Sequence, residues 1–202
     1  MIDYFAMPTS SLVSVLQRGG IAVIPTDTLY GIVARAEDKR AVRRLYRMRR
    51  ETKRKKPFVI LIARAAALKN FGIVPTAVQK KFLAKVWPGK VSVIFRCSGS
   101  RFAYLHLDVK TLAFRVPRSR PLRTLLRAAG PLVAPSANCE GEKPAETIPT
   151  ARQYFGESVD FYMDAGKRLR AAPSMIVSLC EKTPRILRKG AGWRHVRSFL
   201  LS

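Results

Sequence analysis

The sequence predicts a single α/β domain that spans residues 1–202. Short apolar runs bounded by Gly or Pro alternate with segments of helical periodicity, which is the pattern of buried strands joined by amphipathic helices. The chain has the length of one large domain, and 48% hydrophobic with 25% charged residues is the balance of a folded protein. The sequence contains no internal repeat or low-complexity tract.

Seven apolar runs predict the strands, because each run is short and ends close to turn-forming residues. Their apolar character predicts a sheet that is mostly buried. The runs are Ile21–Ile24, Phe58–Ile62, Val91–Phe95, Leu112–Val116, Leu132–Ala134, Met175–Ser178 and Arg185–Leu187.

One predicted helix, between the first two of these strands, has a strongly basic face. Its apolar side chains recur at helical spacing, and its arginines fall largely on the other side. The segment from Lys39 to Lys56 holds eleven Lys and Arg residues against one carboxylate, Glu51. Such a run is either a solvated face or a surface that lines a phosphate site and tracks an RNA backbone. The apolar positions of the helix are Val42, Leu45, Tyr46 and Met48.

Capping residues predict three further helices. Ser119 is a predicted N-cap, because Pro follows near the first helical position and apolar residues recur behind it. Similar caps are predicted at Thr76, before the helical segment Val78–Val86, and at Thr150, before a short segment that ends at Gly156.

The charge of the chain is unusual. Lys and Arg number 38 against 13 Asp and Glu, which gives a formal net charge of +25. A positive field of this size attracts phosphate polymers and releases their counterions on contact. RNA is therefore an expected partner, with general basicity or a compositional bias as the alternative.

Cysteine usage and hydropathy predict a cytoplasmic protein. Cys97, Cys139 and Cys180 lie far apart and are odd in number, which fits neither a disulfide framework nor a paired metal site. The N-terminus lacks the pattern of a signal peptide, and no apolar stretch approaches the roughly 20 residues of a membrane span. The tail 192–202 keeps apolar residues, so we expect it to pack on the body or to pair with another chain.

Polar signatures follow the predicted strand ends, where ligands bind in open α/β sheets. The first is PTDTLYG, directly after Ile21–Ile24. The hydroxyl groups of Thr26 and Thr28 are suited to holding a small polar substrate, and Tyr30 adds a ring and a further hydroxyl. The alternative is an ordinary turn, because Thr, Asp and Gly all favour turns.

Two more strand ends carry candidate anion-binding groups. Ser136 and Asn138 alternate in the loop APSAN, so both side chains can face one ligand, while small neighbours let backbone N–H groups approach phosphate oxygens. Arg115 ends another strand, and its guanidinium can fork onto a phosphate or a carboxylate. Trp87, in the segment WPGKVS, is more typical of a core residue.

Six elements together occur in the order and spacing of the YrdC-like family, which this chain resembles over roughly Gly19 to Ala191. The resemblance implies a twisted, mixed α/β sheet with helices around a concave, positively charged cavity. The elements are PTDTLYG, WPGKVS, FRVP, APSAN, Asp164-Ala165-Gly166 and ILRKGA.

The resemblance also implies an activity. Enzymes of this family are ATP-dependent nucleotidyltransferases, L-threonylcarbamoyladenylate synthases, which form threonylcarbamoyl-AMP and pyrophosphate from L-threonine, bicarbonate and ATP. Other proteins of tRNA modification then move the threonylcarbamoyl group onto a tRNA adenosine beside the anticodon. Contacts with tRNA and with such proteins are therefore expected.

The resemblance assigns roles to individual residues. It assigns threonine binding to Thr26, Thr28 and Tyr30, and nucleotide binding to Arg115, Ser136, Asn138 and Arg188. Mg²⁺ usually bridges the phosphates of such substrates and can be held mostly by ATP, so no protein metal ligand is expected.

The family's Lys-x-Arg pair after the first helix is altered in this chain. Aligning the helix places Arg49 on the lysine and Glu51 on the arginine, whereas aligning the following strand places Arg50 and Thr52 there. We expect the catalytic positive charge to come from Arg49, Lys53 and Lys56.

Two other functions stay open. The altered pair and the high charge also fit a non-catalytic YrdC-like protein that binds double-stranded RNA, tRNA or ribosomal RNA. A third possibility keeps the nucleotide site but uses another acyl or carbamoyl substrate.

Overall fold

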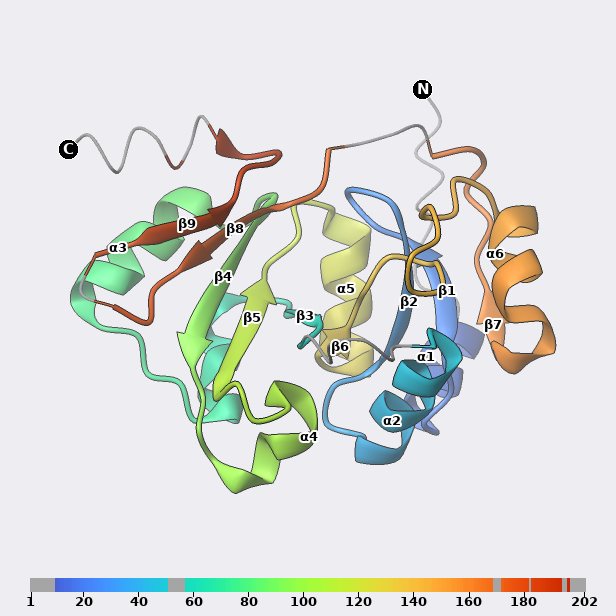
Figure 1. The fold of residues 1–202 in the computed structure, drawn as a ribbon, viewed down its shortest axis with the longest axis horizontal. Helices are drawn as coiled ribbons and strands as arrows, with labels where there is room; N and C mark the ends of the chain where they lie inside the picture. Colours follow the sequence, from blue (N-terminus) through green and yellow to red (C-terminus); the bar gives the residue numbers. More distant parts are fainter. Residues whose placement is uncertain (1–9, 51–56, 169–171, 182, 194–195, 197–202) are drawn as a thin grey trace.

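The computed structural model describes residues 10–50, 57–168, 172–181, 183–193 and 196. Within these residues, a mixed sheet of nine strands crosses the molecule (Figure 1). The strand order is β7-β1-β2-β6-β3-β5-β4-β8-β9. The strands are β1 (Ala22–Pro25), β2 (Tyr30–Arg35), β3 (Val59–Leu61), β4 (Val91–Arg96), β5 (Thr111–Arg115), β6 (Leu132–Val133), β7 (Phe161–Tyr162), β8 (Met175–Ser178) and β9 (Arg185–Arg188).

Three neighbouring pairs in this sheet are parallel, namely β7 with β1, β3 with β5, and β4 with β8. The other five neighbouring pairs are antiparallel. The predicted α/β class and mixed sheet are therefore confirmed.

Six α-helices and three short 3₁₀ helices surround the sheet within the described ranges. The α-helices are α1 (Ser10–Gln17), α2 (Lys39–Met48), α3 (Ala77–Val86), α4 (Ala103–His106), α5 (Arg120–Ala129) and α6 (Ile148–Phe155). The 3₁₀ helices are η1 (Ala65–Phe71), η2 (Ser100–Phe102) and η3 (Gly156–Ser158).

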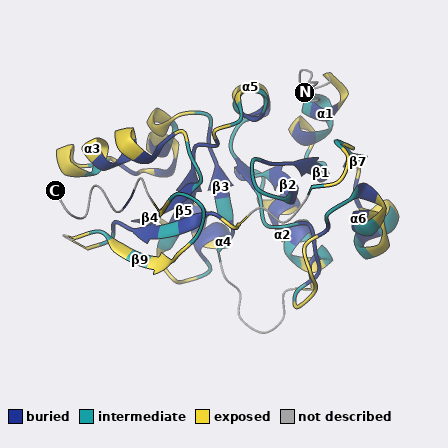
Figure 2. Cartoon of the chain, turned by 90° about the horizontal axis from the view of Figure 1, so that it is seen from above, coloured by how far each residue is buried: buried dark blue, intermediate teal, exposed yellow. Residues whose placement is uncertain are grey.

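Strand β1 is buried on both faces, because helices cover it from both sides (Figure 2). Ala22 and Ile24 pack in one apolar cluster with side chains of α1 and α5. Val23, which points the other way, packs in a second cluster with residues of α2 and α6. This two-sided burial explains why the strand reads as a continuous apolar run.

Capping residues define several helix starts as the sequence predicts. Ser119 accepts a hydrogen bond from the Leu122 N–H at 3.3 Å at the start of α5. Thr76 and Gln79 form a reciprocal capping box at the start of α3. The prediction for α6 is wrong in register, because the cap is Thr147, whose side chain accepts a hydrogen bond from the N–H of Thr150.

Strands β2 and β7 were not predicted. Strand β2 begins at Tyr30, inside the segment that the sequence marks as a polar loop, so only Thr26–Leu29 remains as a tight turn between β1 and β2. Strand β7 has only two residues, which is too short to show any periodicity.

The C-terminal tail contributes Val196 to the hydrophobic core. Val196 is fully buried in the same cluster as Val91 and Met175. Packing of the tail on the body is therefore observed at Val196, while residues 194–195 and 197–202 lie outside the described part. Among the described helices, none is long and apolar enough to cross a membrane.

Candidate active site

The turn between β1 and β2 is held by the hydroxyl group of Thr26. This hydroxyl donates to the carbonyl of Leu29 at 2.7 Å and accepts hydrogen bonds from the N–H groups of Thr28 and Leu29. It also lies 3.1 Å from the hydroxyl of Thr28. Thr26 is buried, whereas Thr28 is half-buried. Thr26 therefore shapes the turn, and Thr28 lies closer to its surface.

Tyr30 connects this turn to the Asp164-Ala165-Gly166 element. Its hydroxyl donates to the Gly166 carbonyl at 2.8 Å and accepts from the Ala165 N–H at 2.9 Å. The side chain is fully buried, and this burial raises the pKa of the phenol. The structure thus places Tyr30 as an internal anchor of the turn.

Asp27, at the tip of the same turn, forms a buried ion pair with Arg115. Arg115 Nη1 donates to Asp27 Oδ1 at 2.7 Å, and the two side chains are 5% and 7% exposed. The other carboxylate oxygen accepts from the Arg118 N–H at 3.1 Å. One aspartate therefore fixes both the end of β5 and the loop that follows it.

One donor of the Arg115 guanidinium remains unsatisfied within the described part of the chain. Its Nε is buried and has no hydrogen-bond partner among the described residues. Burial lowers the pKa of its guanidinium, and the nearby Asp27 carboxylate opposes that shift. A buried guanidinium with an unsatisfied N–H is a strong binding group for an anion, because the contact is charge-assisted.

Ser136 lies beside the start of β2. Gly31 and Ser136 form an isolated β-bridge, and backbone hydrogen bonds of Ile32 with Pro135 and of Ala137 with Tyr30 flank it. A Cβ atom at Gly31 would lie 3.1 Å from Thr26 Cγ2, so glycine allows the turn and the loop to approach closely.

Asn138 organises the APSAN loop from inside. Its Oδ1 accepts a hydrogen bond from the Ser136 hydroxyl at 2.5 Å, and its amide donates to the carbonyls of Cys139 and Glu142. Because Asn138 is only 6% exposed, Ser136 is the more accessible side chain of the two.

The C-terminal end of α2 is joined to this loop by Arg49. Arg49 Nε donates to the Asn138 carbonyl at 2.9 Å, and the Arg49 carbonyl accepts from the Glu140 N–H at 2.8 Å. Arg49 is buried and lies over the ring of Phe58. The other two predicted catalytic residues, Lys53 and Lys56, lie outside the described residues.

Two further arginines approach the same region. Arg188 donates from Nε and Nη2 to the Ser174 carbonyl, at 3.1 and 2.8 Å. Burial lowers the Arg188 pKa, and the positive charge of Arg115 lowers it further, so the two guanidinium groups are close enough to interact. Arg168 Nη2 donates to the Thr26 carbonyl at 2.9 Å, which adds a third cation.

The predicted convergence of the strand ends is therefore largely present. Hydrogen bonds and the ion pair bring the Thr26–Leu29 turn, Arg115 and Ser136 together, and Arg188 lies within electrostatic range of Arg115. The sequence reasoning did not assign roles to Asp27 or Arg168. Asp27 stood inside the PTDTLYG motif, but its partner lies 88 residues away. Arg168 follows the Asp164-Ala165-Gly166 element without any local pattern.

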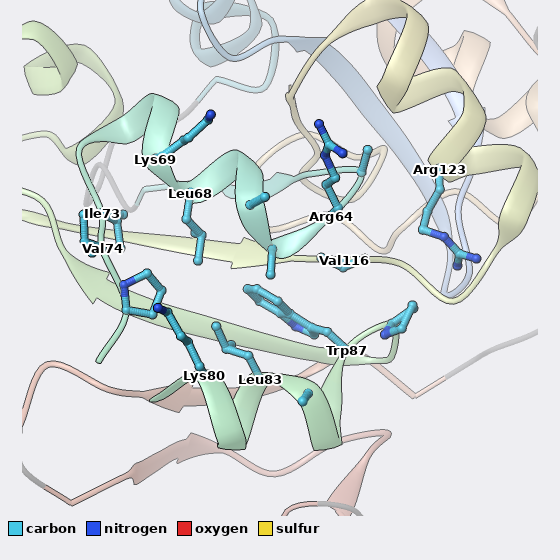
Figure 3. Close-up of a pocket in the computed structure, with 16 residues that line it drawn as sticks. Arg64, Leu68, Lys69, Ile73, Val74, Lys80, Leu83, Trp87, Val116 and Arg123 are labelled. Atoms are coloured by element: carbon cyan, nitrogen blue, oxygen red, sulfur yellow. The ribbon is translucent and has the colours of Figure 1, made fainter. Parts of the chain in front are cut away.

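A separate pocket of about 540 Å³ lies between η1 and α3 (Figure 3). It shares Trp87, Pro88 and Val116 with the sequence motifs. Its lining includes none of the residues to which nucleotide or threonine binding was assigned. It is therefore distinct from the cluster around Arg115.

The described residues contain no group of three or more His, Cys, Asp or Glu side chains that could hold a metal ion. The acidic groups at the site already have partners, because Asp27 pairs with Arg115 and Asp164 accepts from the Gly166 N–H at 2.8 Å.

Comparison with known proteins identifies the relatives of this chain. The Sua5_yciO_yrdC family model, described as "Telomere recombination", matches residues 14–190. A threonylcarbamoyl-AMP synthase of Idiomarina loihiensis is 31% identical over 163 residues, which cover 80% of this chain and 88% of the relative. A Mycobacterium leprae protein that bears the same name provisionally is 34% identical over 188 residues, covering 93% of this chain and 85% of the relative.

Solved structures share the fold. Escherichia coli YciO superimposes with a TM-score of 0.78 at 25% identity and covers 90% of this chain and 88% of its own. Pyrococcus abyssi Sua5 complexed with L-threonine gives a TM-score of 0.80 at 24% identity over 88% of this chain. This chain spans about half of that Sua5 chain, 52%. By the family match over most of its length, the chain belongs to the Sua5/YciO/YrdC family.

Proposed function

We propose that this chain is a threonylcarbamoyl-AMP synthase, which makes threonylcarbamoyl-AMP and pyrophosphate from L-threonine, bicarbonate and ATP. The observation that carries the proposal is the junction of the Thr26–Leu29 turn, Arg115 and Ser136. The half-buried hydroxyl groups of Thr28 and Ser136 thereby lie in the same cluster as a buried cation with an unsatisfied donor. The relatives named for this activity support the same assignment.

The chemistry suits a site of this kind. The amine of threonine and bicarbonate give a carbamate, whose oxygen attacks the α-phosphorus of ATP while the bond to the pyrophosphate leaving group breaks. The protein needs no nucleophilic side chain. It must hold two anions in line and stabilise the negative charge on the phosphate oxygens.

We propose the following roles on the nucleotide side, from the contacts of each residue. Arg115 and Arg188 neutralise the phosphates or the carbamate, and Asp27 orients Arg115. The Ser136 hydroxyl contacts the nucleotide, and Asn138 holds the loop that presents it. Arg49 positions this loop from the end of α2, and Lys53 and Lys56 are proposed to supply further charge.

On the threonine side, we propose that Thr28 contacts the amino acid directly. Thr26 and Tyr30 act through the shape of the turn, because their hydroxyl groups are already bonded within the protein. Mg²⁺ is proposed to enter with ATP, held by the phosphates, since the described acidic groups at the site are engaged.

The test measures pyrophosphate in the presence of ATP, bicarbonate and L-threonine. Pyrophosphate should appear only when threonine is present. Ser136→Ala should lower the rate by about tenfold or more, because a lost hydrogen bond to a charged group is worth roughly 1.5–3 kcal/mol. The matched control is Ser98→Ala, at an exposed serine outside the site, and it should retain the full rate. Pyrophosphate release at the same rate with and without threonine would instead favour another acyl or carbamoyl substrate.

RNA binding is the second candidate function. The outer face of α2 supports it, because its exposed side chains are the cations Lys39, Arg40, Arg43 and Arg47. The same assay separates the candidates when it is paired with tRNA binding at increasing salt. Absence of turnover, together with tight tRNA binding that falls steeply with salt, would support a non-catalytic RNA-binding protein.

A further inference from the structure

We propose that the pocket between η1 and α3 binds a small organic carboxylate with an apolar body. This site is separate from the cluster around Arg115, and the inference does not depend on the proposed synthase activity. A volume of about 540 Å³ lies within the usual range of small-molecule sites, roughly 300–1,000 Å³.

The pocket is apolar over most of its surface. Leu68, Leu83 and Trp87 lie at its base and are at most 8% exposed, whereas Val74 at its rim is 82% exposed. The indole N–H of Trp87 donates to the Val91 carbonyl at 2.7 Å, so the polar atom of this side chain is already satisfied. The pocket therefore offers hydrocarbon surface to a ligand, and covering that surface would stabilise the complex.

The charged groups of the pocket all have the same sign. Arg64, Lys69, Lys80 and Arg123 line it, and no Asp or Glu is among its lining residues. Figure 3 shows Arg123 at one end of the pocket and Arg64 across from Trp87, while Ile73 and Val74 lie at the other end, where Lys80 also reaches. The two guanidinium groups predict a ligand with its anionic group at the arginine end and its apolar body toward Ile73.

The surroundings of Arg123 favour an anion. Its Nη1 donates to the carbonyls of Pro117 and Arg118 at 2.8 and 2.6 Å, which holds the guanidinium at the pocket mouth. Burial lowers the Arg123 pKa, and the positive charges of Arg127 and Arg120 lower it further, although the Asp27 carboxylate opposes this shift. A carboxylate placed there would relieve repulsion among these cations.

The pocket suits a small molecule better than a polymer. Most of its lining is apolar, whereas an RNA strand would need cations along a track and a peptide would need backbone partners along its length. We therefore assign the site to a compact amphipathic anion, for which decanoate is the probe.

Binding can be followed at the two tryptophans. Trp87 lines the pocket and Trp193 does not, so their indole N–H signals in a ¹H–¹⁵N spectrum report on the pocket and on a position outside its lining. Trp193→Phe assigns the two signals. Decanoate should shift the Trp87 signal saturably and leave the Trp193 signal in place, and decanol should bind at least about tenfold more weakly, since it lacks the charge-assisted contact.

Two matched pairs of variants localise the effect. Arg64→Glu should weaken decanoate binding about tenfold, whereas Lys81→Glu, on α3 but outside the lining, should change it less than about twofold. Ala84→Phe places a ring in the pocket and should abolish the shift. Ala77→Phe, at the exposed start of the same helix, should not.

An unmoved Trp87 signal would overturn the proposal. Equal weakening by Arg64→Glu and Lys81→Glu would overturn it too, because general attraction to the basic surface would then explain the binding. Equal affinity for decanol and decanoate would show an apolar cavity without anion selectivity, which contradicts the assignment.

Discussion

At the scale of single residues, the ion pair between Asp27 and Arg115 is the contact on which the site depends most. Both side chains are almost fully buried, and Asp27 also binds the backbone of Arg118. Removing one partner from a buried pair is far more costly than the pair itself is worth, because the remaining charge stays desolvated.

We therefore predict that Asp27→Asn destabilises the protein by about 3 kcal/mol. Urea unfolding followed by circular dichroism measures this change. Glu37→Gln is the control, because the Arg35–Glu37 pair spans 3.8 Å with side chains about 30% exposed, and its loss should cost less than about 1 kcal/mol. Equal effects of the two variants would show that the Asp27 pair is not structurally special.

At the scale of elements, local patterns predicted those parts of the fold that local chemistry determines. The α3 and α5 starts follow from the capping residues Thr76 and Ser119, and apolar runs locate seven of the strands. Strand β2 was missed because Tyr30 and Gly31 read as loop residues, and only pairing with β1 and β6 makes them extended. The third cap was predicted at Thr150 and lies three residues earlier, at Thr147, because either threonine is a suitable N-cap residue by sequence alone.

The candidate site was predictable in part for the same reason. The motifs identified Thr26, Arg115 and Ser136 because each follows a strand. The internal bonding of Tyr30 and Asn138 depends on contacts with distant segments, such as the 2.8 Å hydrogen bond from Tyr30 to Gly166. No pattern within a single segment reports those contacts.

Asp160 illustrates how one side chain connects elements. It precedes β7, accepts a hydrogen bond from the Ile21 N–H at 2.7 Å, and pairs with Arg44 of α2 at 2.7 Å. Partial burial raises the pKa of its carboxyl, but the hydrogen bonds from Arg44 and Ile21 outweigh this and leave the pKa below its ordinary value of 3.8.

A lowered folded-state pKa gives a definite pH dependence. The stabilisation from Asp160 is fully present above about pH 4 and is lost as the pH falls through the lower folded-state pKa, because protonation then favours unfolding. Asp160→Asn should reduce stability at pH 7 by about 1 kcal/mol, discounted for the partial exposure of the pair. The substitution should also reduce the loss of stability as the pH falls from 7 to 3.

Urea midpoints measured from pH 7 down to pH 3 test this prediction. Glu157→Gln serves as control, because its partner Arg152 lies 3.9 Å away and both side chains are largely exposed. If the urea midpoint of Asp160→Asn falls with pH as steeply as that of the unmodified protein, other carboxyl groups cause the pH dependence.

At the scale of the whole molecule, the candidate site exists only when the sheet is complete. Thr28 follows β1, Arg115 ends β5, Ser136 follows β6, and Arg188 ends β9, so residues from nearly the full length of the chain meet there. The pocket between η1 and α3 lies close in the fold, since Arg123 at its mouth binds the loop whose Arg118 N–H contacts Asp27. The candidate site and the pocket therefore share one loop while differing in chemistry.

Titration calorimetry of L-threonine and of α,β-methylene-ATP tests most directly whether these residues form one site that holds an amino acid beside a nucleotide. Both ligands should bind saturably. Arg115→Lys should weaken the binding of each ligand by about tenfold, because the ammonium group of lysine cannot keep the bond to Asp27 and also present the planar set of N–H donors of a guanidinium. Unchanged affinity for both ligands in Arg115→Lys, or a loss confined to one of them, would contradict the shared site.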